Sequence, residues 1–406
     1  MKRKIFNWIE GGRNPLIIFG LIFISWFVIL LGAWPGVYAY DAAWQYGMLT
    51  GDAPFTTHHP VIHTLWLGNC IRLGETVLGS ANAGMLIYSL SQMIICASGL
   101  TYILCRVLRH DSPRKYIIFV VALAWIMLFP LNGVMAVCSI KDSVFAVLFP
   151  IVVLELGEFL QNTDRYLKSK RWILLISATF LSIIFRNNMR YAFAATGASI
   201  LLISLLKKKT IVKNILYVFA APLLLMIIYE KTLYPAFGIT PGSEVEKWCV
   251  PIQQVAAVYN YSEIEGNEKL SESELNDLFA YASEEIWKAY VPECSNHVKD
   301  YFSFSAGKKR FVLLWARLLY KYPQQYIEAF VNLTENYWNP FIVQESKHIS
   351  FLQFKCFEPV TFEPVLAGMY RYLYSLCNDR TYLKLPVIRL LFNNGGYLWG
   401  AVLNCD

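Results

Sequence analysis

PLIIFGLIFISWFVILLGAW, residues 15–34, is an uncharged apolar run, and it decides the class of fold that this chain can adopt. About 20 residues rising roughly 1.5 Å each in an α-helix cross the hydrocarbon core of a bilayer, which is about 30 Å thick. The basic segment MKRKIFNWIEGGRN before the run is typical of a signal peptide, but the run is too long for one and no small-residue cleavage site follows it. We therefore predict a membrane anchor that is retained.

The composition of the whole chain agrees with a membrane protein. Of its 406 residues, 56% are apolar and only 16% are charged, a balance that would make a water-soluble domain of this length insoluble. The net charge of +7 does not indicate nucleic-acid binding, because Lys and Arg occur in short groups between apolar runs rather than along one face or tail. We therefore expect membrane lipids, and no nucleic acid, among the partners.

Apolar runs recur along the first half of the chain, and with their interfacial flanks they are long enough to be transmembrane helices. They cover residues 15–34, 81–105, 116–131, 143–160, 172–185, 191–206 and 214–229. The sequence thus predicts an all-α polytopic membrane protein with about seven transmembrane helices.

Positive residues between the runs predict which side of the membrane each connection faces. Alternate connections hold dense groups of Lys and Arg, which mark cytoplasmic ends. These groups are Lys2, Arg3, Lys4 and Arg13; Arg106, Arg109, Arg114 and Lys115; Arg165, Lys168, Lys170 and Arg171; and Lys207, Lys208, Lys209 and Lys213. The connections around 35–80, 131–142 and 186–190 carry few positive residues and should face outward. We expect a multi-pass protein of the cell membrane with a cytoplasmic N-terminus.

The composition changes after about residue 233. Residues 1–233 are expected to form the transmembrane domain, with 35–80 as its first outer loop. Residues 234–382 mix polar, charged and aromatic residues and predict a mainly helical extracytoplasmic domain, in which the amphipathic stretch 317–340 is suited to the outer leaflet. Residues 383–406 begin like a further membrane segment that the end of the chain would truncate.

Ionisable side chains follow the first apolar run in PGVYAYDAAWQYGMLTGDAPFTTHHP, residues 35–60. Asp41 is expected at the outer membrane surface among aromatic residues that suit the headgroup zone. Such a carboxylate serves as a general base, or alternatively as a simple helix cap. His58 and His59 precede Pro60, which suits the start of a helix lying at or dipping into the membrane.

Two other predicted outer ends also carry charge. SIKDSVFA places Lys141 next to Asp142, and FRNNMRYAF places Arg186 and Arg190 one helical turn apart. Arginines on one face suit a phosphate, although a topological accident or an ion pair with an acid such as Asp142 explains each of them equally well. Taken together, these charges predict a site for an anionic lipid-linked substrate in the outer leaflet.

Metal and disulfide chemistry are left open by the sequence. His59 and His63 are four residues apart and suit one helix face, but neither an HExxH motif nor a third ligand accompanies them, so no metal ligand is assigned and a divalent ion stays an open cofactor. The nine cysteines contain no CxxC pair, and their disulfide pairing cannot be deduced from one sequence.

The order of these motifs resembles the GT-C superfamily of polytopic glycosyltransferases. In that superfamily a catalytic Asp follows the first span, and a His-Pro or Pro-Pro segment then leads to a juxtamembrane helix and the second span; Asp41, HHPVIHTLWLG and the 81–105 run follow this plan. This sequence has one clear Asp near the first span instead of an Asp-Glu or Asp-x-Asp pair.

A closer resemblance covers nearly the whole chain. The chain is similar to a family of bacterial membrane proteins, largely Gram-positive, known as domain of unknown function 6020. The motifs that carry this similarity are YDAAWQY, HHPVIHTLWLG, KDSVFA, FRNNMRYA, VPIQQVA and YPQQYIEAFVNLTENYWNP.

The superfamily resemblance implies a fold and a reaction. The fold is GT-C-like, and the reaction is inverting transfer of a sugar from a polyprenyl-phosphate donor to an acceptor hydroxyl of a cell-envelope polymer, lipid or protein. Asp41 is then the catalytic base. The substrate-binding residues are Gln45, His58, His59, Lys141, Asp142, Arg186 and Arg190. The sugar, the lipid chain, the acceptor and the oligomeric state stay open.

Two other classes of function also fit a chain of this kind. One is a lipid or solute transporter in which Arg186 and Arg190 relay an anion, although the inverted repeats and broken helices typical of transporters are not evident in the sequence. The other is a non-catalytic assembly protein whose outer region binds a cell-wall polymer. In an assembly protein Asp41 and Arg186 would be unimportant, which substitution of the two residues tests.

Overall fold

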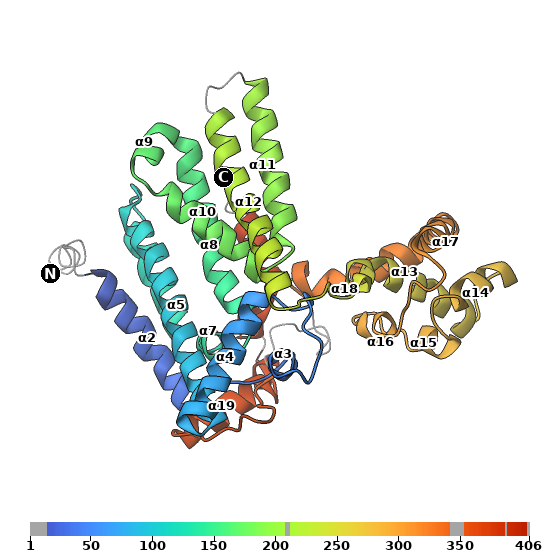
Figure 1. Ribbon diagram of the computed structural model, residues 1–406, viewed down its shortest axis with the longest axis horizontal. Helices are drawn as coiled ribbons and strands as arrows, with labels where there is room; N and C mark the ends of the chain where they lie inside the picture. Colours follow the sequence, from blue (N-terminus) through green and yellow to red (C-terminus); the bar gives the residue numbers. More distant parts are fainter. Residues whose placement is uncertain (1–13, 208–211, 342–352, 386–387, 404–406) are drawn as a thin grey trace. The chain divides into compact units, whose positions relative to one another are not determined.

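The computed structural model describes residues 14–207, 212–341, 353–385 and 388–403. Every named element within these ranges is a helix, and the β pairing there is limited to isolated bridges, so the all-α prediction is confirmed for the described residues (Figure 1). The predicted N-terminal basic group, Lys208, Lys209 and Cys405 lie outside them.

Contacts divide the chain into two compact units, each made of two separate stretches. Unit 1 is Met1–Gly242 with Leu352–Asp379, and unit 2 is Ser243–Phe351 with Arg380–Asp406. The predicted extracytoplasmic domain, 234–382, is thus shared between the two units.

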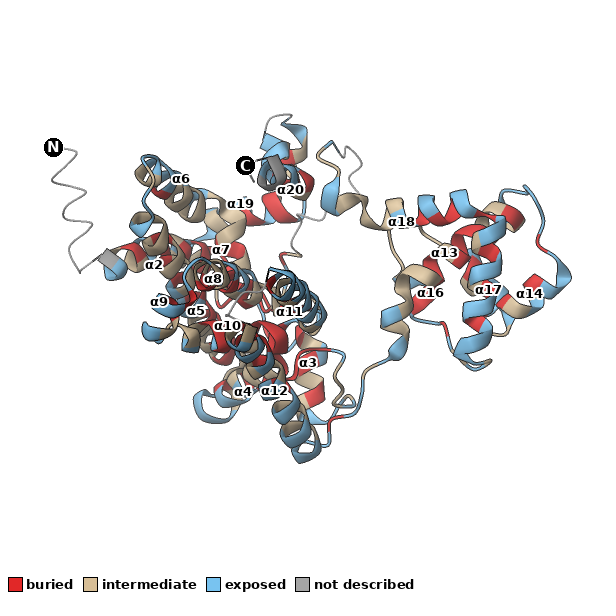
Figure 2. Cartoon of the chain, turned by 90° about the horizontal axis from the view of Figure 1, so that it is seen from above, coloured by how far each residue is buried: buried red, intermediate tan, exposed pale blue. Residues whose placement is uncertain are grey.

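Unit 1 contains the helices that are long and apolar enough to cross a bilayer. Within the described residues, five of them qualify by length and composition: α2 (Asn14–Gly32), α5 (Ala81–Arg109), α8 (Asp142–Gln161), α11 (Met189–Leu206) and α12 (Val212–Ala236). Exposed Leu, Ile and Val side chains on these helices suit contact with lipid. Figure 2 shows the buried residues of unit 1 gathered where its helices meet. The described residues therefore support a multi-pass membrane protein.

Two predicted spans differ in the structure. The run at 116–131 becomes α6 (Lys115–Leu128) and α7 (Pro130–Val137), which meet at a bend of 60° and make a sixth span only if they are taken together. Pro130 has no N–H to continue α6, but it suits the first turn of α7. The fifth predicted span, α10 (Trp172–Phe185), has only 14 residues, or about 21 Å of helix.

Further helices between the spans complete this part of unit 1: α3 (Ala42–Thr50), α4 (Val61–Leu78) and α9 (Thr163–Lys168). The helix predicted after Pro60 is therefore α4. It lies very close to α5, because a Cβ added at Gly74 would come within 2.2 Å of the backbone nitrogen of Gly84. The two glycines allow the backbones to touch and fix α4 against α5.

A return segment, residues 353–379, packs on the end of α2. The Phe357 N–H donates to the carbonyl of Tyr38 at 2.9 Å, and the Glu363 N–H donates to the carbonyl of Trp34 at 2.8 Å. Its helix α19 (Ala367–Cys377) lies against α2, where Gly32 leaves room for Met369. These contacts explain why the segment belongs to unit 1.

Unit 2 is a cluster of short helices around an aromatic core. Trp287, Phe311 and Tyr259 are almost fully buried there. The helices are η1 (Glu244–Trp248), α13 (Cys249–Tyr259), η2 (Asn260–Ile264), α14 (Glu272–Phe279), α15 (Glu284–Lys288), α16 (Asn296–Lys299), α17 (Lys308–Lys321), α18 (Pro323–Trp338), η4 (Thr381–Lys384), η5 (Ile388–Phe392) and α20 (Asn394–Leu403). Most of 383–406, the stretch predicted to start another membrane segment, forms η5 and α20 in this unit, where α20 packs on α18.

Candidate functional site

The backbone before α3 is held against the connection between α7 and α8. The Val37 N–H donates to the carbonyl of Val137 at 3.0 Å, and the Ser139 N–H donates to the carbonyl of Val37 at 2.9 Å, which makes a short parallel bridge. Asp41 follows the bridge by a few residues in one segment, and Lys141 follows it by a few residues in the other. The bridge therefore brings two distant stretches of sequence into register.

Asp41 lies between two positive or potentially positive groups. Its Oδ2 atom is 3.2 Å from Lys141 Nζ and 3.4 Å from His59 Nδ1. The Asp41 side chain is 49% exposed, whereas that of His59 is only 5% exposed, so the histidine forms the buried wall and the carboxylate faces outward. Asp41 occupies the N-cap position of α3, but within the described residues its side chain makes no capping hydrogen bond. Its carboxylate is therefore not used to cap the helix.

The surroundings of Asp41 also decide its charge. Burial by itself would raise the pKa of this carboxyl group, but the charges of Lys141 and His59 and the hydrogen bond from Lys141 outweigh it. The net result is a pKa below the ordinary value, because each neighbour favours the ionised form. Asp41 is consequently a carboxylate at neutral pH.

This lowered pKa predicts how acid destabilises the protein. A carboxyl group whose pKa is lower in the folded state contributes stability above its unfolded-state pKa and loses that contribution as the pH falls through the folded value. We expect the melting temperature of the wild type to fall more steeply than that of Asp41→Asn from about pH 5 to about pH 3. Parallel melting curves for the two proteins across this range would contradict the assignment.

A buried chain of hydrogen-bonded polar side chains, Gln45, His63, Tyr88 and Gln92, lies behind this arrangement. His63 on α4 places Nδ1 2.6 Å from Gln45 Oε1 and Nε2 2.8 Å from the Tyr88 hydroxyl. The Tyr88 hydroxyl also lies 2.6 Å from Gln92 Oε1, and Gln92 Nε2 donates to the carbonyl of Cys138 at 2.7 Å. The side chains of this chain are at most 1% exposed. It therefore connects the first turn of α3 with the α7–α8 connection.

This chain changes the roles predicted for two residues. Gln45 is buried and holds His63, so it faces into the protein and supports the site without lying at its surface. Burial lowers the pKa of His63 to about 3, so its ring is neutral. In the described structure the two nitrogens of that ring face protein oxygens, Gln45 Oε1 and the Tyr88 hydroxyl.

His58, which precedes His59 in the chain, is exposed. Its ring meets that of His59 edge to face, with centroids 4.6 Å apart. Among the residues that the structure describes, no group of three or more His, Cys, Asp or Glu side chains is placed to hold a metal ion. The eight described cysteines are free thiols.

The second predicted cation, Arg186, pairs with Asp142, the neighbour in sequence of Lys141. Its Nε atom lies 2.9 Å from Asp142 Oδ1, and Asp142 directly follows Lys141. The ion pair joins the end of α10 to the start of α8. The ion pair with Asp142 is one of the interpretations left open by the sequence, and it lies beside Lys141 in the chain.

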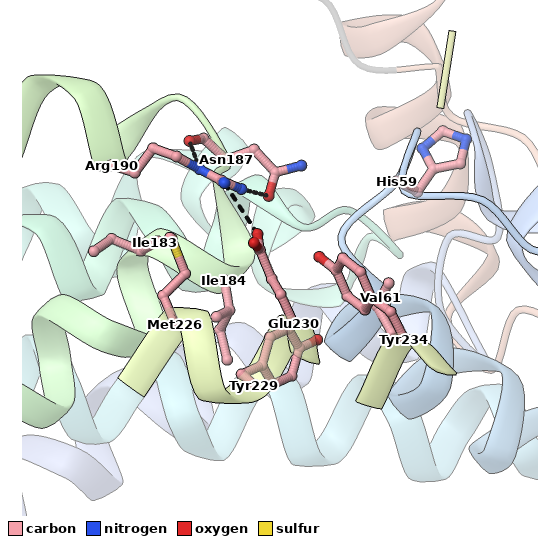
Figure 3. Close-up of a pocket in the computed structure, with 10 residues that line it drawn as sticks. All are labelled: His59, Val61, Ile183, Ile184, Asn187, Arg190, Met226, Tyr229, Glu230 and Tyr234. Carbon is pink, nitrogen blue, oxygen red and sulfur yellow. Dashed lines mark hydrogen bonds and ion pairs between the residues drawn. The ribbon is translucent and has the colours of Figure 1, made fainter. Parts of the chain in front are cut away.

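Arg190 lies with His59 along a narrow cleft in which the side chains leave no room for a water molecule. Arg190 Nη1 is 3.0 Å from Glu230 Oε1, and its Nε and Nη2 atoms donate to the backbone and side-chain oxygens of Asn187 at 3.0 and 3.2 Å. Figure 3 shows these three side chains turned toward one another, with His59 across the cleft. The lining residues are His59, Val61, Ile183, Ile184, Asn187, Arg190, Met226, Tyr229, Glu230 and Tyr234.

The cleft contains functional candidates that the sequence analysis did not select. Glu230, Tyr229 and Tyr234 come from α12, and Glu230 directly follows the predicted apolar run 214–229. An acid at the end of an apolar helix is itself a signal, because a charge there is costly unless it is paired. Asn187 lay inside the quoted motif FRNNMRYAF but was assigned no role.

Two glutamines from the motif VPIQQVA belong to the core of unit 2. Gln253 Nε2 donates to the carbonyl of Val291 at 2.6 Å, and Gln254 Nε2 donates to the carbonyl of Tyr326 at 3.2 Å. Both amides thus satisfy backbone carbonyls in their own unit, which is a structural role.

Comparison with known proteins identifies a family. The model of a family of unknown function, DUF6020, matches residues 46–352, about three quarters of the chain. The chain belongs to the DUF6020 family. No curated protein and no solved structure matches this DUF6020 protein. The matched residues include His59, Lys141 and both arginines of the site, whereas Asp41 and Gln45 precede them.

Proposed function

We propose that this DUF6020 protein is a membrane glycosyltransferase that moves a sugar from a polyprenyl-phosphate donor to an acceptor hydroxyl at the outer face of the membrane. One observation carries the proposal: a half-exposed carboxylate, Asp41, lies between Lys141 and a buried histidine and is not used to cap its helix. The same histidine, His59, also lines the cleft that contains Arg190. A base next to cations is the arrangement that transfer from a phosphate-linked donor requires.

The proposal includes an orientation and a fold type. The Asp41 end of the helices faces outward, because the predicted connections at the other end carry the dense Lys and Arg groups. The N-terminus is then cytoplasmic. The sequence of an Asp after the first span, a His-Pro segment and a short helix before the second span supports a GT-C-like fold, and α10 with the α6–α7 pair would bring the number of spans to seven.

The ion pairs at the site indicate how a donor would enter. Each cation of the site has a single acidic partner in the described structure: Lys141 with Asp41, Arg186 with Asp142 and Arg190 with Glu230. A donor phosphate that draws one of these cations away is itself paired, and it leaves the acid with one positive neighbour fewer. Pairing the phosphate in this way costs less than burying it as an unpaired anion.

Exchange at Lys141 would also activate the base. Asp41 with a lowered pKa is a weak base, and a catalytic base works best when its pKa lies near the working pH. When the donor phosphate takes the Lys141 ammonium group, the main charge that lowers the pKa of Asp41 is neutralised. Donor binding thus prepares Asp41 to accept a proton.

The transfer step follows from these positions. The acceptor oxygen forms a bond to the anomeric carbon of the sugar while the bond from that carbon to the phosphate oxygen breaks. The bonding electrons leave with the phosphate, and the acceptor proton passes to Asp41. Lys141 and the arginines stabilise the phosphate that departs, and His59 holds the Asp41 carboxylate in place. The new linkage has inverted stereochemistry at the anomeric carbon.

Replacing Lys141 tests the exchange. We expect Lys141→Gln to raise the KM for the polyprenyl-phosphate sugar about tenfold, because a charged hydrogen bond to the donor is lost. We expect the acid limb of its pH–rate profile to move upward, because the pKa of Asp41 rises when Lys141 is removed. Lys141→Arg keeps the charge and should restore most of the donor affinity. An unchanged KM and pH profile in Lys141→Gln would exclude this role.

The reaction itself can be identified without knowing the acceptor. Surface polymers, lipids and proteins from a strain that lacks the protein are compared by mass spectrometry with those of the parent strain. The proposed activity predicts that one of them loses a mass increment the size of a sugar residue. Identical masses in every fraction, with the gene product expressed in the parent, would count against glycosyl transfer.

A further inference from the structure

A second polar cavity lies at the other end of the unit 1 helices. It has a volume of about 670 Å³ and opens between the C-terminal half of α5, the end of α8 and α9. Tyr88 in the buried polar chain and Arg106 in this cavity lie 18 residues apart on α5, which is about 27 Å along a helix. The cavity is therefore distinct from the Asp41 site.

A network of paired charges, here called the floor, joins the lining residues Arg106, Glu158 and Arg171 to Glu155, which lies behind the lining. Glu155 of α8 is completely buried, accepts a hydrogen bond from Tyr166 at 2.8 Å and is paired with Arg171. Glu158, one turn later, is paired with Arg171 and Arg106. Two carboxylates thus balance two guanidinium groups. The network leaves the floor neutral and fixes the positions of both arginines.

The rim of the cavity carries the surplus positive charge. Arg109 and Arg165 are exposed residues that line the cavity and form its rim, and neither side chain has an acidic partner among the described residues; exposed His110 also lines the cavity. Asp111 is the one acid that lines the cavity besides Glu158, again within the described part of the chain. Since the floor is neutral, the two arginines outweigh this single aspartate.

We propose that this cavity binds a phosphate-bearing headgroup. A volume of this size exceeds what one phosphate fills and is in the range of small-molecule sites. Guanidinium groups bind phosphate oxygens in a bidentate manner, and Arg109 and Arg165 approach the opening from different helices. Asn162 and Ser169 add hydrogen-bonding groups for the polar part of a headgroup. This ligand is independent of the proposed sugar transfer.

Two sources supply this chemistry, a membrane phospholipid and a soluble phosphoester. A phospholipid is suited to the place, because Leu154 in the lining belongs to α8, which is long and apolar enough to span the bilayer. A lipid ligand is tested by comparing the binding of phosphatidylglycerol with that of phosphatidylcholine. A soluble phosphoester is tested with glycerol 3-phosphate.

The test compares two double variants of the full-length protein. Arg109→Gln with Arg165→Gln removes both rim arginines, whereas Arg114→Gln with Lys168→Gln removes the same charge from exposed positions nearby that do not line the cavity. Phosphatidylglycerol binding is counted by native mass spectrometry of the protein from mixed micelles, and glycerol 3-phosphate binding is measured by calorimetry. Melting temperatures check that the variants fold. If the double rim variant does not fold, binding is measured with Arg109→Gln and Arg165→Gln separately.

We expect the rim variant to weaken binding of at least one probe by about tenfold or more and the control variant to change it by less than about twofold. Loss of phosphatidylglycerol binding alone identifies a lipid site, and loss of glycerol 3-phosphate binding identifies a soluble ligand. Equal binding by the rim and control variants, or equal binding of phosphatidylglycerol and phosphatidylcholine together with no binding of glycerol 3-phosphate, overturns the proposal.

Discussion

Asp41→Asn is expected to lower glycosyl transfer by about 100-fold or more while the protein still inserts and folds. The amide keeps the size and most of the hydrogen-bonding shape of the side chain, but it does not accept the acceptor's proton. It also removes the negative charge between Lys141 and His59. Because the Asp41 side chain is half exposed, we expect only a small change in melting temperature at neutral pH.

The measurement is made in the strain that lacks the protein, complemented with each variant at equal expression. Wild type should restore the sugar-sized mass increment, and Asp41→Asn should not. Asp52→Asn is the matched control, since Asp52 is an exposed acid in the same loop and lies outside the site. An Asp41→Asn protein that restores the full increment would remove this residue from the mechanism.

Gly36→Ala is the second change with a large expected effect. Gly36 has φ of 137°, a conformation that costs other residues roughly 1–3 kcal/mol. A Cβ there would also lie 2.0 Å from Ser89 Oγ and 3.1 Å from the carbonyl of Val137. The segment would have to leave its bridge with the α7–α8 connection. We expect a loss of roughly 2–4 kcal/mol in the free energy of unfolding and a separation of Asp41 from Lys141.

Gly20→Ala provides the control for this change. Gly20 lies in α2, and a Cβ there would have nothing within 4 Å, so the substitution should be tolerated. Melting of both purified variants shows the difference in stability, and the transfer assay shows whether Gly36→Ala also loses activity. A Gly36→Ala protein as stable and as active as Gly20→Ala would show that the bridge does not position the site.

Much of the membrane part follows from the sequence, because a bilayer demands long apolar helices that leave a strong pattern. The run at residues 15–34 and the other long runs became helices in this way. The bend between α6 and α7 was harder to predict. Pro130 was visible in the sequence, but whether a proline kinks one span or starts a new helix depends on what packs beside it.

The site was predictable in its members and less so in their partners. Asp41, His59 and Lys141 come together as the charge pattern suggested. The pairing of Arg190 with Glu230 joins two helices and is set by packing, which spacing along the chain does not reveal. Gln45 is among the substrate-binding residues that the superfamily resemblance implies, yet its side chain is buried and contacts His63.

Photo-cross-linking with a diazirine-bearing polyprenyl-phosphate sugar tests most directly whether the Asp41 site holds the donor. We expect labelled peptides from residues 35–60 and from the end of α12 near Glu230, with the labelling suppressed by unlabelled polyprenyl phosphate and reduced in Lys141→Gln. Labelling confined to the cavity around Arg106 and Arg165, or labelling at the Asp41 end that polyprenyl phosphate does not suppress, would contradict the proposed site of transfer.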